Sequence, residues 1–374
     1  MSHIEIKTVN SNKDLMNFIK LQWKIYANDP QWVPPLISDR KKLLDKKKNP
    51  FFQHSEMEMF LAYKDSELVG RIAAITNENH NKFQNDNVGF YGFYECIDDQ
   101  KVNDTLFKTA EDWLKAKGKD KMLGPMNPST NDEAGLLIEG FDTPPYVLMC
   151  HNPAYYAKLH DNYGLVKAKD LLAWHLDIRG MELPEKIKRV VEASTKKYGL
   201  EIRNIHLKKL KKELQLIREI YNDAWSRNWG FVPLTFDEID HLAADLKQIV
   251  REEFVLMVEK EGRPIGFLLT LPNINEILTQ IPNGKLLPTG IFKLLTGLKK
   301  IKTVRVVTLG VVKDYQHIGL GTILYTEIIK RAQAQGIIGG EMSWILEDND
   351  AMNRPIQLLG SNKYKTYRVY EKNL

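Results

Sequence analysis

The most informative pattern in the 374-residue chain is an apolar run that ends in two closely spaced glycines. Residues 306–312 are mostly apolar and β-branched, which is typical of a buried strand. A turn containing Gln316, Gly319 and Gly321 follows, and apolar residues then recur at helical spacing until Gly336. The pattern predicts a strand, a glycine-containing turn and a helix in immediate succession.

The pattern continues toward the carboxyl end of the chain. Residues 341–346 predict a second strand, residues 347–353 open another helix, and residues 364–370 predict a last strand.

Two pairs of segments also resemble each other about half a chain apart. Residues 26–36 and 221–234 each carry tryptophan ahead of a Val-Pro step and a leucine. Residues 60–73 and 254–267 each predict a β-hairpin. Two matched elements in the same order indicate a duplication of domain size.

The glycine-containing turn has the properties of an anion site. The first backbone N–H groups of a helix have no intrahelical partner, and the helix dipole places roughly +0.5 charge there. Glycine lacks the Cβ that would hold a phosphate away. Neither the Gly-x-Gly-x-x-Gly of dinucleotide-binding folds nor the Gly-Lys-Ser/Thr of a P-loop is present at this turn. We expect a diphosphate on residues 317–322.

The order Gln-x-x-Gly-x-Gly after a strand ending Leu309-x-Val311 resembles the acyl-CoA-binding motif of the GNAT superfamily of N-acyltransferases. The resemblance implies that Leu309 and Val311 contact the pantetheine arm, and that Asn349 or Asn353 reaches toward it. It also implies a pyrophosphate loop formed by Gln316, His317, Ile318, Gly319, Leu320, Gly321 and Thr322.

The resemblance extends to the whole architecture. It implies an α/β (α+β) fold of two tandem GNAT-like domains, each a central mixed, mostly antiparallel sheet flanked by helices. We expect an N-terminal domain at residues 1–179, a linker at 180–184, and a C-terminal domain at residues 185–374 that holds acyl-CoA. Mycothiol synthase and the Fem-type peptidyltransferases are similar in having two fused domains.

The first copy is not expected to bind CoA. At the position of the glycine loop it has residues 97–104, which include Asp98, Asp99 and Asp104 and no glycine. Carboxylates are good helix N-caps, but they would repel a diphosphate.

Direct attack of an amine on a thioester requires a group that removes a proton from the ammonium. Glu341 and Glu347 border the strand next to the predicted CoA strand and are candidates for this base; both could instead be surface carboxylates. Tyr364 and Tyr367 are candidate acids for the leaving thiolate, with sheet packing as the alternative. Many GNAT proteins carry a Tyr for this purpose before the last helix ends, where this chain has Ile356.

Composition excludes several other classes of protein. Cys96 and Cys150 lack metal-ligand spacing, so we expect no metal and no disulfide framework. The net charge of +5 is modest, and lysine-rich helix faces without a reading motif do not indicate a nucleic-acid partner. No apolar signal core and no run of ~18 apolar residues occurs, so we expect a cytoplasmic protein without stable membrane insertion.

Two stretches lie outside the duplicated pattern. Residues 124–135 combine turn formers and small polar groups, either as a solvated connection or as a polar lining for an acceptor. Residues 273–302 suggest amphipathic helices broken by prolines. We favour a lid or an inter-domain pad over a surface that touches a membrane.

The sequence predicts an acyl-CoA-dependent N-acyltransferase, with acetyl-CoA as the first candidate donor. The acceptor is a small-molecule, amino-acid or peptide amine. A CoA-binding regulatory protein without activity and a Fem-type aminoacyl or peptidyl transferase are the alternatives. The sequence does not define the acceptor, the acyl length or the oligomeric state.

Overall fold

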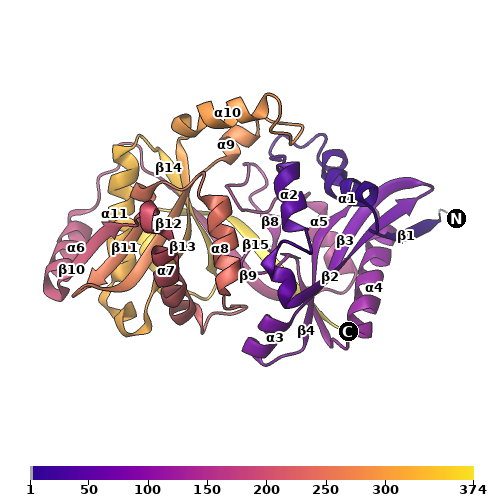
Figure 1. Cartoon of the computed structure of the whole chain (residues 1–374), viewed down its shortest axis with the longest axis horizontal. Coiled ribbons are helices and arrows are strands. Elements are labelled where there is room, and N and C mark those ends of the chain that lie inside the picture. The colour runs from indigo at the N-terminus through magenta and orange to yellow at the C-terminus, as the bar shows by residue number, and fades with distance from the viewer. Residues whose placement is uncertain (1–2) are drawn as a thin grey trace. The chain divides into compact units, whose positions relative to one another are not determined.

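The computed structural model describes residues 3–374, which form two compact units (Figure 1). Unit 1 comprises the described residues up to Leu171 together with residues 281–290 and 365–374. Unit 2 comprises residues 172–280 and 291–364. Unit 1 thus includes two segments from late in the chain. The expected domain boundaries, with a linker at residues 180–184, stay a prediction.

Unit 1 is built on a sheet in the order β1-β2-β3-β4-β5-β15, to which β15 contributes its residues from 365 onward. The pairs are antiparallel except for the parallel pair β4–β5. The elements that begin in this unit are β1 (Ile4–Thr8), α1 (Asn12–Ile25), α2 (Ile37–Leu43), η1 (Pro50–Gln53), β2 (Ser55–Lys64), β3 (Glu67–Asn77), α3 (Glu78–Gln84), β4 (Val88–Cys96), α4 (Gln100–Ala116), β5 (Lys121–Gly124), β6 (Met126–Asn127), β7 (Glu133–Ala134), β8 (Leu136–Glu139), α5 (Tyr155–Asn162) and β9 (Val166–Asp177).

Helix α4 shows how the sequence pattern produces this unit. Val102, Leu106, Ala110 and Leu114 are spaced by four residues, lie on one helix face and are fully buried. Asp99 caps the helix by accepting hydrogen bonds from the backbone N–H groups of residues 101 and 102. The expected capping by a carboxylate is confirmed.

Unit 2 has a sheet in the order β9-β14-β13-β12-β11-β10, where β9 contributes residues 172–177. Again one pair, β13–β14, is parallel and its neighbours β12–β13, β11–β12 and β10–β11 are antiparallel. The elements are α6 (Glu185–Tyr198), β10 (Leu200–Asn204), η2 (Leu207–Lys209), α7 (Leu210–Trp225), α8 (Phe236–Leu246), η3 (Glu252–Phe254), β11 (Val255–Lys260), β12 (Arg263–Pro272), α9 (Asn275–Leu278), α10 (Gly290–Gly297), η4 (Leu298–Lys300), β13 (Thr303–Val311), η5 (Lys313–Ile318), α11 (Leu320–Ala334), β14 (Gly339–Leu346), α12 (Asp350–Leu358) and β15 (Asn362–Asn373).

The two faces of the unit 2 sheet are covered by different helices. On one face Leu324 and Ile328 of α11 belong to the same apolar core as Val304 and Met342 of the sheet. On the other face Ile220 of α7 packs with side chains of β11 and β12. A mostly antiparallel sheet flanked by helices in each unit confirms the expected fold class.

The expected duplication is confirmed at the level of strand register. In unit 1 a bulge follows the pair Ala62↔Gly70, and Gly70 also pairs with Cys96. In unit 2 a bulge follows the pair Val258↔Gly266, and Gly266 also pairs with Val311. The carboxyl ends of the two central strands can therefore be matched, with Cys96 of β4 equivalent to Val311 of β13 and Glu95 equivalent to Gly310.

Candidate active site

The central feature of unit 2 is a separation between its two parallel strands. β13 and β14 pair from Thr303↔Gly339 to Val306↔Met342. Both strands then continue, β13 to Val311 and β14 to Leu346. The last part of β13 thus pairs with β12 along one edge. Along its other edge it is no longer paired with β14.

The backbone of β13 directs polar groups toward this second edge. The N–H of Val312 donates to the carbonyl of Ile265 in β12 at 3.0 Å. Because successive residues of a strand alternate in direction, the polar groups of Val311 and Leu309 point to the opposite edge. One of them is used within the loop, since Gln316 Nε2 donates to the Val311 carbonyl at 3.1 Å. An extended ligand arm has the geometry to add to this edge as a further strand would.

The glycine loop joins β13 to α11 through the short helix η5. Ile318 and Leu320 are buried, and Gly319 between them adopts the left-handed conformation with φ of +80°. A Cβ at Gly319 or at Gly321 would meet no atom within 4 Å, so both glycines face open space. His317 is exposed beside them.

The N-terminus of α11 has no side-chain cap. Its N-cap residue is Gly319, which offers no side-chain acceptor to the first-turn N–H groups. In unit 1 the matching helix α4 has the Asp99 carboxylate in that position. The helix end in unit 2 can therefore receive an external anion, whereas the chain's own carboxylate occupies the equivalent end in unit 1.

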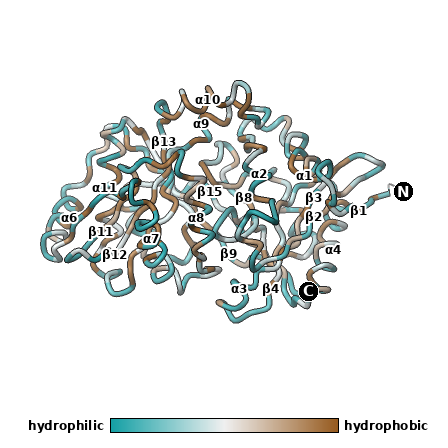
Figure 2. The backbone as a smooth tube through the Cα atoms, viewed as in Figure 1, coloured by the Kyte–Doolittle hydropathy of each residue, from teal (hydrophilic) through white to brown (hydrophobic). Residues whose placement is uncertain are grey.

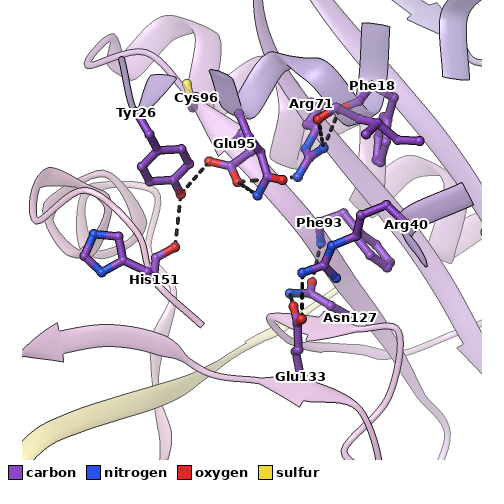
Figure 3. Close-up of polar contacts among 12 residues, drawn as sticks. Phe18, Tyr26, Arg40, Arg71, Phe93, Glu95, Cys96, Asn127, Glu133 and His151 are labelled. Atoms are coloured by element: carbon purple, nitrogen blue, oxygen red, sulfur yellow. Dashed lines mark hydrogen bonds and ion pairs between the residues drawn. The ribbon is translucent and has the colours of Figure 1, made fainter. Parts of the chain in front are cut away.

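The gap between the parallel strands is filled in unit 1. β4 pairs with β5 from Val88↔Lys121 to Phe90↔Leu123 and then continues to Cys96 on β3 without β5. The Asn127 side chain accepts a hydrogen bond of 2.6 Å from the N–H of Phe93, on β4, as Figure 3 shows. A Cβ added to Gly92 would lie 1.6 Å from the carbonyl oxygen of Met126. The segment at residues 126–127 thus lies directly against this stretch of β4.

A buried ion pair further distinguishes unit 1. Arg71 and Glu95 pair across β3 and β4, where unit 2 has Phe267 and Gly310. Glu95 lies 3.4 Å from Arg71 and accepts a hydrogen bond from Tyr26 (Figure 3). It also accepts hydrogen bonds from Gln22 and Tyr156. Burial raises the pKa of Glu95, and the Arg71 guanidinium opposes that shift. The Glu95 carboxylate is thus matched by one cation and three hydrogen-bond donors.

Glu341, a predicted base, lies at the point where β13 and β14 separate. It is fully buried, 3.5 Å from Arg305, and accepts a 2.5 Å hydrogen bond from the Ser343 hydroxyl. The Tyr364 hydroxyl donates to its other oxygen. Arg305 also donates to Ser343 Oγ at 2.9 Å. We refer to Glu341, Arg305, Ser343 and Tyr364 as the Glu341 cluster.

The Glu341 cluster lies on the sheet face away from α11. Met342 and Val304 pack in the core formed with α11, and side chains alternate along a strand. Glu341 and its register partner Arg305 therefore face the other way. Tyr364 is only half-buried, so it connects the buried carboxylate to the surface of the unit.

His175 borders the Glu341 cluster. Its ring lies 5.7 Å from the Tyr364 ring, centroid to centroid. Burial lowers the pKa of His175, and the Glu341 charge opposes that shift. His175 is thus held toward its neutral form.

The remaining predicted residues have structural contacts. Asn349 caps α12 through a 3.2 Å hydrogen bond from the N–H of Met352. Asn353 donates to the Leu346 carbonyl at 3.0 Å and accepts from Trp174 at 2.9 Å. Glu347 is half-buried just beyond β14, and Ile356 is part of the buried core. Tyr367 is fully buried in unit 1.

Sequence reasoning missed Arg305, Ser343 and His175. Arg305 carries a signal, because a charged residue interrupts the otherwise apolar run at residues 304–307. A charge inside a buried strand requires a partner, and that partner is close by. Nothing local in the sequence connects Arg305 with Glu341.

No cluster of three or more His, Cys, Asp or Glu among residues 3–374 has the arrangement of a metal site. None of the helices in that range combines the length and the apolar character needed to cross a bilayer.

Comparisons with known proteins agree on one family. Residues 214–356 match the model of the acetyltransferase (GNAT) family. The chain is 39% identical to a bacterial ceramide synthase of Caulobacter vibrioides, over 99% of this chain and 98% of that protein. It is 37% identical to protein YghO of Escherichia coli, over 99% of this chain and 95% of that protein. A tandem GNAT protein from the clavulanic acid biosynthesis pathway has a similar fold, with a TM-score of 0.58 at 10% identity, covering 99% and 98% of the two chains.

Proposed function

The chain belongs to the GNAT family of acyltransferases as a tandem-domain member, and from this premise we propose that it is an N-acyltransferase for a long-chain amino alcohol. The observation that carries the proposal is the match to a ceramide synthase over essentially the full length of both proteins. A ceramide is an amide formed between a fatty acid and such an amine. We infer that fatty acyl-CoA is the donor.

The open edge of β13 supports the position of the donor. The pantetheine arm pairs with the backbone at Leu309 and Val311, and the diphosphate lies on the first turn of α11 around Gly319 and Gly321. Gln316 stabilises the loop through its hydrogen bond to the Val311 carbonyl. A backbone N–H on β13 polarises the thioester carbonyl.

The reaction is a direct displacement. The amine nitrogen forms a bond to the thioester carbonyl carbon, the C–S bond breaks, and CoA leaves as a thiolate that takes up a proton. The protein holds the two reactants in line, which lowers the entropic part of the barrier. An ammonium cannot attack, so a proton must first leave the nitrogen.

We assign this proton transfer to Tyr364 and Glu341. Glu341 is fully buried and bonded on both oxygens, which argues against direct contact with the amine. Tyr364 is half-buried and donates its hydroxyl proton to Glu341. In this relay the ammonium gives a proton to the Tyr364 oxygen while Tyr364 passes its own to Glu341, which leaves a neutral amine. Glu347 remains the alternative for the base, whereas Tyr367 is fully buried in unit 1 and is not proposed as the acid.

The proposal is tested by turnover with matched donors and acceptors. Acetyl-CoA and palmitoyl-CoA are each combined with a long-chain amino alcohol, a free amino acid or a short peptide, and the amide product is measured by mass spectrometry. We expect product from palmitoyl-CoA with the amino alcohol. Product from the amino acid or the peptide, with none from the amino alcohol, would contradict the proposed acceptor.

A second function is favoured by one residue. Ile356 stands where many family members have a catalytic Tyr, which is compatible with a CoA-binding protein that has no transferase activity. CoA binding without any amide product in the same assay would support this second function over the first.

A further inference from the structure

The insertion between β12 and β13 carries an unusual concentration of exposed apolar side chains. Among the residues that the structure describes, four large apolar side chains are more than 60% exposed, namely Leu287, Phe292, Leu295 and Leu358. Three of the four lie within residues 287–295. Single exposed apolar residues are normal on protein surfaces, but a cluster of them indicates an interaction site.

Helix α10 packs against the protein on one side and is exposed to solvent on the other. Gly297 lies against Ile277, because a Cβ at this glycine would be 2.8 Å from an Ile277 methylene carbon. Ile277 itself is 2% exposed. Phe292 and Leu295 are three residues apart and share one helix face, which is open to solvent. The hydropathy colouring of α10 in Figure 2 shows its apolar character.

The charged side chains on this segment have a single sign, although Glu276, directly before it, accepts hydrogen bonds from the backbone N–H groups of Lys302 and Thr303. Residues 277–302 contain Lys285, Lys293, Lys299, Lys300 and Lys302 and no Asp or Glu. Five positive charges in this stretch equal the formal net charge of the whole chain, which is +5. The lysine-rich segments elsewhere differ, since α6 has Glu185 and Glu192 among its lysines.

We propose that α10 and the residues that follow it, up to residue 302, dock on an anionic lipid bilayer. Exposed Phe and Leu side chains enter the boundary between head groups and acyl chains, while flanking lysines contact the head-group phosphates. A protein partner would be expected to need acidic residues matched to each lysine, whereas a membrane offers a continuous negative surface. The docking is interfacial and involves no membrane-spanning helix.

Docking would explain how the enzyme reaches its substrates, and this part of the inference rests on the proposed function. Fatty acyl chains and long-chain amines partition into membranes, so an enzyme held at the bilayer surface meets both substrates there. The exposure and the charge of α10 and the residues that follow it do not depend on the reaction. Membrane binding can therefore be measured without any substrate.

The test is co-sedimentation of the full chain with vesicles. One set contains phosphatidylcholine and phosphatidylglycerol in equal parts, and the other contains phosphatidylcholine alone. We expect binding to the anionic set and little binding to the neutral set. We also expect F292S/L295S and K299E/K300E to lower the partition coefficient about tenfold or more, since each removes one of the two attractions.

V190S is the matched control. Val190 is 53% exposed on the lysine-rich helix α6, and its replacement should leave vesicle binding unchanged. Calorimetric binding of coenzyme A and the melting temperature should be the same in every variant, which separates loss of docking from misfolding. Failure of the wild-type chain to bind anionic vesicles, or unchanged binding by both double variants, would overturn the proposal. The proposal would also be overturned if the wild-type chain did not bind vesicles and formed an oligomer in gel filtration that the F292S/L295S substitutions dissociate.

Discussion

The backbone N–H of Phe93 donates a hydrogen bond of 2.6 Å to Asn127 Oδ1. Phe93 lies on β4 where that strand has left its parallel neighbour β5, at a position equivalent to the open edge of β13. The Asn127 side chain thus lies against the stretch of β4 that corresponds to the open edge of β13. The N–H of Cys96, the residue equivalent to Val311, donates to the Tyr156 hydroxyl at 2.8 Å.

We therefore predict one coenzyme A site per chain. Unit 1 has Asn127 against β4 and Asp99 on the N-terminus of α4, so both the arm position and the diphosphate position are occupied. Isothermal titration calorimetry of the full chain should give a stoichiometry of one. N127A should keep this stoichiometry, because the Asp99 carboxylate still repels the diphosphate. Two equivalent sites would contradict the assignment.

Substitution of Gly319 by Glu should abolish coenzyme A binding. The new side chain would place a carboxylate at the N-terminus of α11, where the diphosphate is expected. The left-handed φ of +80° at Gly319 also adds strain, at about 1–2 kcal/mol for a residue with a Cβ.

Gly199→Glu controls for that strain. Gly199 has φ of +61°, closes α6, and leaves open space for a Cβ. Both variants should lose a similar amount of stability in thermal unfolding, and only G319E should lose affinity. Equal affinity in the two variants would show that the diphosphate lies elsewhere.

Removing the Tyr364 hydroxyl should slow the reaction. Y364F deletes the group that bonds to Glu341 and leaves the Arg305–Glu341 ion pair in place. Proton transfer by a positioned side chain is typically worth 10²–10⁴-fold, so we expect kcat to fall by about a hundredfold or more. In the wild type, kcat/KM should rise with pH and level off when the relay or the amine is deprotonated.

E341Q and E347Q complete this comparison. E341Q should also reduce kcat, although it disturbs a buried ion pair and should lower the melting temperature as well. E347Q should retain activity within about tenfold, which is far less than the loss of a catalytic base. A near-normal rate in both Y364F and E341Q would exclude the relay.

Stability should depend on pH through His160. This side chain is fully buried among the rings of Tyr94, Phe107 and Tyr370, and burial lowers its pKa from 6.5 to about 3. Between these two pKa values the unfolded chain binds a proton that the folded chain does not bind. The free energy of unfolding should therefore decrease as pH falls below about 6.5 and be fully retained above it.

H160F provides the comparison for this prediction. Phenylalanine keeps the aromatic packing and cannot titrate, although it loses the 2.8 Å hydrogen bond to the Tyr156 carbonyl. Chemical denaturation at several pH values should show a weaker pH dependence in the variant. An identical slope for both proteins between pH values near 6.5 and 4 would mean that His160 does not contribute.

Local pattern was enough to predict the succession of elements. The apolar run before Gly319 forms β13, the periodic residues after it form α11, and the matched hairpins of the two copies have the same register at Gly70 and Gly266. Strand and helix periods are properties of neighbouring residues, and a carboxylate such as Asp99 caps a helix wherever one begins. The family and the fold class came instead from the resemblance of the glycine loop and its flanking elements to the GNAT motif.

The sequence by itself therefore determined the elements, the duplication and the difference between a glycine turn and an acidic turn. Tertiary structure alone decided which distant residues meet. It brought Arg305 beside Glu341, placed Asn127 against Phe93, and assigned residues 365–374 to unit 1. These contacts depend on strand order, on register and on where parallel strands separate, because each is set by the packing of whole elements and no local pattern encodes it.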